Sequence, residues 1–150
     1  MRRHIERAGR GTFRLRLSEQ ERDVLRRLPR QLRSLLDRRD PSVWRLFPPA
    51  YDEEESEAEY RRLMGEELVA AKHEALRIVE ETIDAKRLDE DQLAAWLGAI
   101  NDLRLVFGTR LGVTEELDEE EMLQGPDGAT YSVYLFLGWL EEQAVAALSG

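Results

Sequence analysis

Two histidines and two acidic runs are the residues best suited by type to hold a metal ion. Six of the eight residues over 52–59 are acidic, and six of the seven over 115–121. Helical two-metal sites use Glu-x-x-His pairs, but neither His4 nor His73 has a glutamate three residues before it. Neither run contains the Asp-x-Asp-x-Asp-Gly loop of calcium sites. We therefore expect solvated acidic faces, with no metal and no cofactor.

The sequence also offers little for nucleophilic catalysis. It has no cysteine, and it contains no Gly-x-Ser-x-Gly motif. The glycines at 108 and 112 lack the spacing and the lysine of a phosphate-binding loop, and they are more typical of a helix C-terminus. We expect no catalytic residues and no enzyme.

Charge is divided unevenly along the chain. Residues 1–50 hold 14 arginines and 6 acidic residues, whereas the whole chain has a net charge of −9. A basic surface can neutralise phosphates and release their counterions, so this region is a candidate for binding DNA or a protein partner. The candidate side chains are Arg14 and Arg16 on one strand face, and Arg22, Arg26, Arg30 and Arg33 at helical spacing. Alternatively, these arginines pair with the acidic body, within the chain or across a dimer, or are simply solvated.

A polar set interrupts an otherwise apolar stretch further along. It consists of Asn101, Asp102, Arg104 and Arg110. Together these side chains can form a buried hydrogen-bonded network that fixes packing or a dimer register. A binding site is the alternative.

The N-terminal elements follow from simple patterns. Phe13, Leu15 and Leu17 alternate with polar residues, which predicts a half-buried strand. Residues 3–7 supply a partner strand, and the glycines between them suit a turn. Residues 1–17 are thus expected to form a β-hairpin.

The first helix should begin after Ser18, which with Glu21 makes a capping box. Pro29 lies inside its apolar stripe, so we expect a kink or break near residues 26–28. The helix should end before Pro41, which can open a short helical turn.

Three further helices are predicted. One covers residues 60–83, and the next begins after Asp89 and ends between residues 108 and 112. The last covers residues 131–148 and is apolar almost all round as far as Leu140, which is typical of a central helix. Either its neighbours surround it, or a second subunit covers its remaining side. We favour a homodimer, in which the dimer or core residues are Trp96, Tyr134 and Trp139.

The expected fold is mainly α: a bundle of four main helices plus short connector helices, with a small N-terminal β-hairpin. A length of 150 residues suits a single domain over 1–150, with the hairpin at 1–17 and the helical body at 18–148. The chain shows no signal peptide and no apolar run long enough to span a membrane, so we expect a cytoplasmic protein.

Two blocks of the sequence resemble a known family. The stretch from Trp96 to Thr114, with its Asn-Asp-Leu-Arg-Leu and Gly-Thr-Arg-Leu-Gly-Val runs, and the stretch from Tyr131 to Leu140 look like the signature regions of an actinobacterial family of unknown function. That family includes the oxidative-stress transcriptional regulator AosR. The resemblance implies a transcriptional role. It does not carry over the regulator's cysteine-pair sensor, because this chain has no cysteine.

The sequence therefore predicts a non-enzymatic cytosolic regulator, binding DNA or the transcription machinery through its basic N-terminal region. The alternative is a dimeric protein–protein adaptor. The resemblance links that alternative to Clp proteolysis or sulfur metabolism.

Overall fold

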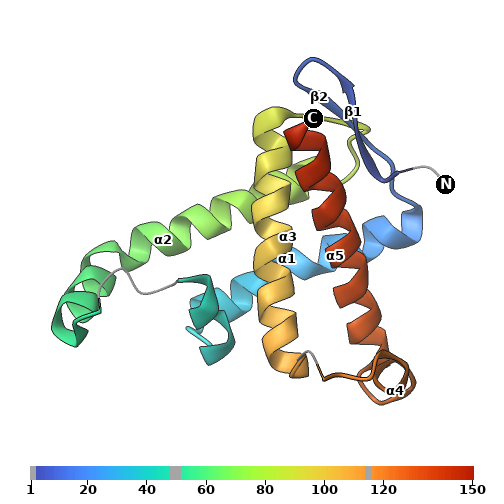
Figure 1. Cartoon of the computed structure of the whole chain (residues 1–150). Coiled ribbons are helices and arrows are strands. Elements are labelled where there is room, and N and C mark those ends of the chain that lie inside the picture. Colours follow the sequence, from blue (N-terminus) through green and yellow to red (C-terminus); the bar gives the residue numbers. More distant parts are fainter. Residues whose placement is uncertain (1–2, 48–51, 114–115) are drawn as a thin grey trace.

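The N-terminal hairpin is part of a larger sheet. In the computed structural model, which describes residues 3–47, 52–113 and 116–150, strands β1 (Ile5–Gly9) and β2 (Thr12–Leu15) pair antiparallel, with Gly11 at a φ of +68° in the turn. A third strand, β3 (Arg87–Asp89), adds to β2, so the strand order is β1-β2-β3. Figure 1 shows the hairpin of β1 and β2 beside the C-terminal end of the chain. The hairpin prediction is confirmed, and β3 is an addition that its three-residue length concealed.

The two faces of this sheet have opposite character. Ile5, Phe13, Leu15 and Leu88 are buried in the hydrophobic core. Residues alternate across a strand, so the positions between them face away from that core. The outward positions carry charged side chains, Arg14 and Arg87 together with Glu6 and Asp89, which gives the sheet an apolar inner face and a charged outer face.

Helix α1 (Glu19–Asp37) begins with the predicted capping box. The Ser18 side chain accepts from the Glu21 amide, and the Glu21 carboxylate accepts from the Ser18 amide. The predicted break at Pro29 is wrong, because the helix is continuous through this residue. Pro29 is itself buried in the apolar stripe, so burial of its ring offsets the one hydrogen bond that it cannot donate.

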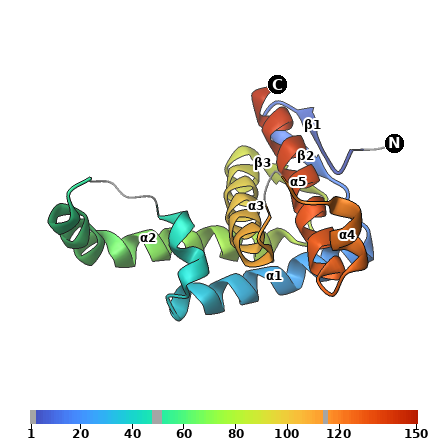
Figure 2. The same ribbon diagram turned by 60° about the horizontal axis from the view of Figure 1, so that its bottom comes forward.

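The connector and the second helix follow. A 3₁₀ helix, η1 (Pro41–Leu46), opens at the proline as expected, and α2 (Glu54–Thr82) starts six residues before the predicted boundary. The buried residues of α2 all lie toward its C-terminus. The N-terminal part of α2 extends beyond the body of the molecule, and Leu63 there is 67% exposed (Figure 2).

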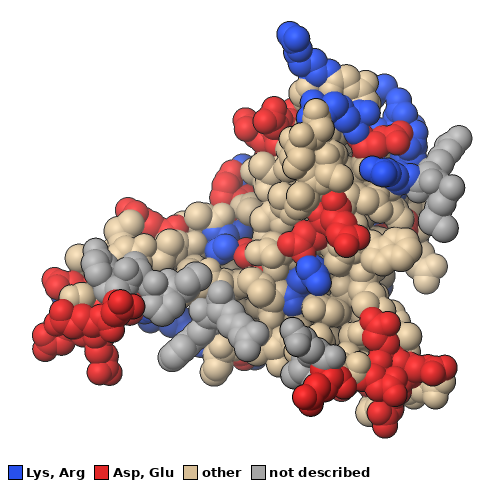
Figure 3. Space-filling model, viewed as in Figure 1, with Lys and Arg blue, Asp and Glu red and all other residues tan. Residues whose placement is uncertain are grey.

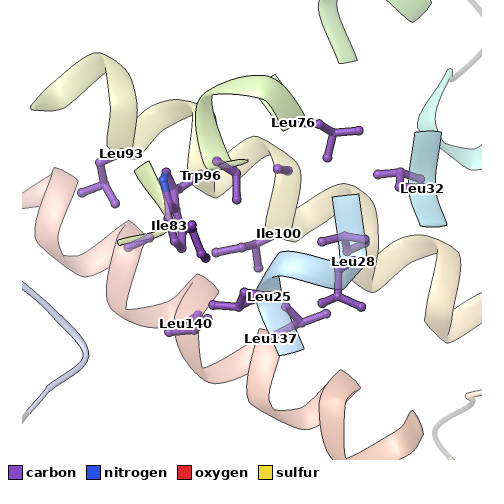
Figure 4. Close-up of a cluster of buried hydrophobic side chains, with 14 of the residues drawn as sticks. Leu25, Leu28, Leu32, Leu76, Ile83, Leu93, Trp96, Ile100, Leu137 and Leu140 are labelled. Carbon is purple, nitrogen blue, oxygen red and sulfur yellow. The ribbon is translucent and has the colours of Figure 1, made fainter. Parts of the chain in front are cut away.

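The central helix is α3 (Glu90–Leu111), not the last one. It begins at a capping box made by Asp89 and Gln92, and it ends at Gly112 in the left-handed conformation. It packs against α2, α5 (Gly128–Ser149), η1 and β3, with Trp96 fully buried among leucines from four helices (Figure 4). Helix α5 lies along one side of α3 and leaves Trp139 58% exposed.

A short helix, α4 (Glu119–Gln124), and a tight turn lead into α5. The turn brings Gly128 so close to α4 that a Cβ there would lie 2.1 Å from the Leu123 carbonyl oxygen. A glycine is therefore required at the start of α5.

The C-terminal end of α5 is fixed to the sheet. The Ile5 amide donates to the Gln143 side chain at 3.0 Å, and Arg7 donates to the Ala147 carbonyl at 3.0 Å. The cation of Arg7 lies near the negative end of the helix dipole and helps to satisfy a terminal carbonyl. The first strand is thereby held against the last helix.

Across the described part of the chain, none of the helices has the length and the apolar character needed to cross a bilayer.

The contact between Trp96 and Thr82 should measure how tightly α2 and α3 are joined. The indole Nε1–H donates to the Thr82 hydroxyl at 2.6 Å in the core. Thr82→Val leaves that donor buried and unpaired, so we expect the free energy of unfolding to fall by about 1–3 kcal/mol. Urea unfolding provides the measurement.

The control is the same substitution in a Trp96→Phe chain. Phenylalanine has no N–H to leave unpaired, so Thr82→Val should cost clearly less there. Equal costs in the two chains would contradict a role for this hydrogen bond.

Candidate functional site

Most arginines of the predicted stripe on α1 bind carbonyl or carboxylate groups of the same chain. Arg22 is buried and donates to the carbonyl of Ile83, the C-cap residue of α2. Arg26 pairs with Asp23 at 2.6 Å and with Asp84, and Arg33 pairs with Glu80. These contacts join α1 to α2, as the alternative interpretation of the stripe predicts. Arg30 is exposed and has no ion pair within the described residues.

A second group of basic residues lies at the outer face of the sheet. A hollow of about 630 Å³ lies there, where β2 and β3 meet the start of α1. Six of its lining residues are cationic: Arg3, Arg14, Arg16, Arg22, Lys86 and Arg87. Figure 3 shows Lys and Arg gathered over the hairpin, with Asp and Glu over the start of α2 and over α4. We call the surface formed by Arg3, Arg14, Arg16, Lys86 and Arg87 the basic sheet face.

The strand register explains why this face carries excess positive charge. Glu6 lies opposite Arg14 across β1 and β2, and Arg14 lies opposite Arg87 across β2 and β3. Glu6 serves two cations, Arg16 at 2.6 Å and Arg14 at 3.3 Å. The hydrogen bond from Arg16 lowers the pKa of Glu6. Like charges directly opposite each other repel, so the juxtaposition of Arg14 and Arg87 favours a bound anion.

The carboxylate that lines the hollow is already occupied. Glu21 contacts His4 at 2.8 Å and accepts from the Ser18 amide in the capping box. Burial raises the pKa of Glu21, but the hydrogen bonds from Ser18 and His4 outweigh it, so the pKa is lowered overall. Glu21 therefore stays ionised and committed to the end of α1.

Three residues of this face were not predicted from the sequence: Arg3, Lys86 and Arg87. All three are exposed and make no ion pair within the part of the chain that the structure describes. In the sequence, two adjacent basic residues at 86–87 were the only indication of a basic site there. Their position beside Arg14 follows from the pairing of β3 with β2.

The predicted polar network on α3 does not form as one unit. Asp102 is buried and pairs with Lys72 of α2 at 3.0 Å. Arg104 pairs with Glu141 of α5, and its guanidinium lies 5.2 Å from the Tyr134 ring centre. Asn101 and Arg110 are exposed instead. Successive residues of a helix point in different directions, so 101, 102 and 104 face solvent, α2 and α5 respectively.

Burial sets the protonation behaviour of Asp102. Desolvation raises its pKa above the usual value, and Lys72 opposes this only in part. For Arg104, burial lowers the pKa of the guanidinium, but the contact with Glu141 raises it by more, so the pKa is raised overall. Both pairs hold neighbouring helices against α3.

The aromatic residues predicted for the core or a dimer differ in their burial. Trp96 is a core residue with no exposed surface, and Tyr134 is half-buried against Arg104. Trp139 is 58% exposed on the outer side of α5.

The histidines contact single carboxylates. His73 lies 3.1 Å from Asp37, and His4 contacts Glu21. Among the described residues, no three His, Cys, Asp or Glu side chains are grouped as metal ligands would be.

The sequence of this mainly helical chain matches the model of a known protein family over nearly its whole length. The chain is a member of the family described as "Domain of unknown function (DUF2017)", which it matches over residues 1–148. The oxidative stress regulator AosR of Mycobacterium tuberculosis is 31% identical over 129 residues, which cover 74% of this chain and 59% of that protein.

Two further relatives agree with this assignment. AosR of Mycobacterium bovis is also 31% identical over 129 residues, with the same shares of each chain. A Mycobacterium leprae relative is 29% identical over 127 residues, or 73% of this chain and 58% of its own. The chain thus spans less than two thirds of the length of these relatives. No solved structure matches the chain.

The buried Asp102 predicts a specific dependence of stability on pH. Its pKa is raised in the folded state, so ionising it costs more there than in the unfolded chain. Asp102→Asn should therefore raise the free energy of unfolding at pH 7. This gain in stability should shrink as the pH falls through the folded-state pKa of Asp102 toward its unfolded-state pKa. Below both pKa values, Asp102 is protonated in the folded and in the unfolded chain. Chemical denaturation between pH 3.5 and 7 measures it.

Asp52→Asn is the matched control, because it removes the same charge from an exposed position, where a substitution should change stability by less than about 0.5 kcal/mol. If Asp102→Asn instead lowers stability at pH 7, the ion pair with Lys72 outweighs the cost of burial.

Proposed function

We propose that this chain is a non-enzymatic cytoplasmic regulator of transcription that contacts DNA phosphates through the basic sheet face. The observation that carries the proposal is the gathering of five cations around one hollow, with Glu6 shared between two of them. The outer face of a sheet is rigid and presents its charges at fixed spacing, which suits a regular row of phosphates.

The chemistry of this face favours the DNA backbone over the bases. Arginine and lysine supply charge and hydrogen-bond donors to phosphate, and each contact releases counterions. The residues that line the hollow include no Phe, Tyr or Trp on which a base would stack. Sequence preference would then come from DNA shape, from a second copy of the chain or from another protein.

The names of the relatives support a regulatory role, because the curated ones are oxidative stress regulators. This chain cannot sense oxidants through a thiol, since it has no cysteine. Its input must therefore be of another kind.

Removing cations from the basic sheet face tests the proposal. We expect Lys86→Ala with Arg87→Ala to weaken binding to unrelated DNA duplexes about equally. Because two phosphate contacts are lost, the slope of log K against log salt should also become shallower by about 2. Fluorescence anisotropy with a labelled duplex at several salt concentrations measures both effects.

Arg30→Ala with Arg38→Ala is the control pair, since it removes the same charge from exposed positions of α1 and the residue after it. No DNA binding by the wild type at low salt, or equal losses in the two double variants, would contradict the proposal.

A second candidate function, an adaptor that works as a homodimer, rests on the outer face of α5. Trp139 is 58% exposed and Val145 47% exposed on this helix. Tryptophan is enriched at protein–protein interfaces, so Trp139 is the side chain on which this candidate rests. A two-fold axis beside α5 would bring this face against its own copy.

Trp139→Glu tests the dimer without disturbing the core, because the side chain is exposed in the single chain. We expect the wild type to sediment as a dimer at tens of micromolar and the variant as a monomer with a similar urea midpoint. Leu63→Glu places the same charge on the projecting part of α2 and should leave the dimer intact. A monomeric wild type would contradict this candidate.

A further inference from the structure

A second hollow, separate from the basic sheet face, lies where α1, the end of α3 and the start of α5 meet. Its volume is about 530 Å³, within the range of small-molecule sites. Its lining residues come from all three helices and from the turn before α5. Neither the proposed DNA contact nor the proposed dimer surface on α5 uses this cavity.

The inner wall of this pocket is apolar. Leu28 and Phe107 form its buried part, and Val24, Leu111 and Val133 are half-buried around them. An apolar wall that the chain leaves partly open gains free energy when a nonpolar group displaces water from it. The pocket therefore fits a ligand with a hydrocarbon portion.

The rim of the pocket carries two guanidinium groups. Arg27 uses its Nε to donate to the Asp23 carbonyl at 3.2 Å, which leaves its two terminal nitrogens without a carboxylate among the described residues. Arg110 makes no hydrogen bond within the described residues. Its charge helps to lower the pKa of Asp40, which is set mainly by the hydrogen bonds from Ser42. Both side chains are exposed and reach the pocket.

The rim also contains one acidic residue, Asp127, so its net charge is +1. A ligand with a single negative charge matches that balance, whereas a polyphosphate would meet the aspartate. Arginine binds carboxylates through parallel hydrogen bonds, which the terminal nitrogens of Arg27 and Arg110 can supply, since neither makes an ion pair at hydrogen-bond distance within the described residues.

We propose that this pocket binds a small amphipathic organic monoanion, such as a medium-chain carboxylic acid. The hydrocarbon portion packs on Leu28 and Phe107, and the carboxylate is held by Arg27 and Arg110. The site does not depend on DNA binding, so it stands or falls separately from the proposed function.

Octanoate and octan-1-ol provide a matched pair of probes, because they share the chain and differ in the charged head. Titration calorimetry on the full-length protein should show saturable, one-to-one binding of octanoate and at least about tenfold weaker binding of octanol, since a charge-assisted hydrogen bond accounts for that factor or more. Amide chemical shifts should change at the facing parts of α1, α3 and α5.

Arg27→Ala with Arg110→Ala should weaken octanoate binding at least about tenfold. The pair Arg30→Ala with Arg38→Ala, which removes equal charge outside the pocket, should change it less than twofold. Ala129→Trp fills the pocket from an exposed position and should abolish binding of both probes while the urea midpoint stays the same.

Any of three results would overturn the proposal: no saturable octanoate binding by the folded wild type, equal affinity for octanol, or chemical shift changes centred on Trp139 instead of the pocket. A loss of DNA binding with intact octanoate binding would leave the pocket assignment unaffected.

Discussion

The burial of α3 on several sides at once is the constraint on which the rest of the structure depends. Trp96 has no exposed surface, and its indole nitrogen bonds to Thr82 at the last turn of α2. That bond fixes where α2 ends against α3. The chain then has only a few residues in which to return to the start of α3, and three of them extend as β3 beside β2. The packing of one tryptophan thus determines where Lys86 and Arg87 lie.

The arginines of the N-terminal third serve two separate purposes. The arginines of α1 that contact α2 bind the carbonyl of its C-cap residue and the carboxylates of Asp84 and Glu80. These contacts join two helices of opposite net charge. In and next to the sheet, Arg14 and Arg16 share the single carboxylate of Glu6, which leaves positive charge at the surface. The acidic side chains over α2 and α4 lie away from this face (Figure 3), so the field of the whole molecule would orient it toward a polyanion despite a net charge of −9.

Helices α1 and α5 each contribute to more than one of these surfaces. The start of α1 borders the basic sheet face, while its middle lines the pocket between α1, α3 and α5. The start of α5 lines that same pocket, and its outer side carries Trp139. Under the proposed regulatory function, a chain without cysteine needs an input other than thiol oxidation. A ligand site formed by the helices that also carry the two proposed interaction surfaces is physically suited to supply one.

The sequence by itself determined the elements, because their signals are local. The capping boxes at Ser18 and Asp89, the alternation around Phe13, and the left-handed Gly112 all act within a few residues. These signals predicted the four long helices, the hairpin and the mainly α fold, but not the short helix α4. Local rules failed at Pro29, where burial in the core offset the lost hydrogen bond. Tertiary structure alone decided that α3 is central, that Arg22 is buried, that Asp102 and Arg104 face different helices, and that Arg87 lies beside Arg14. Each of these depends on which distant segments meet, and periodicity along one chain carries no information about that.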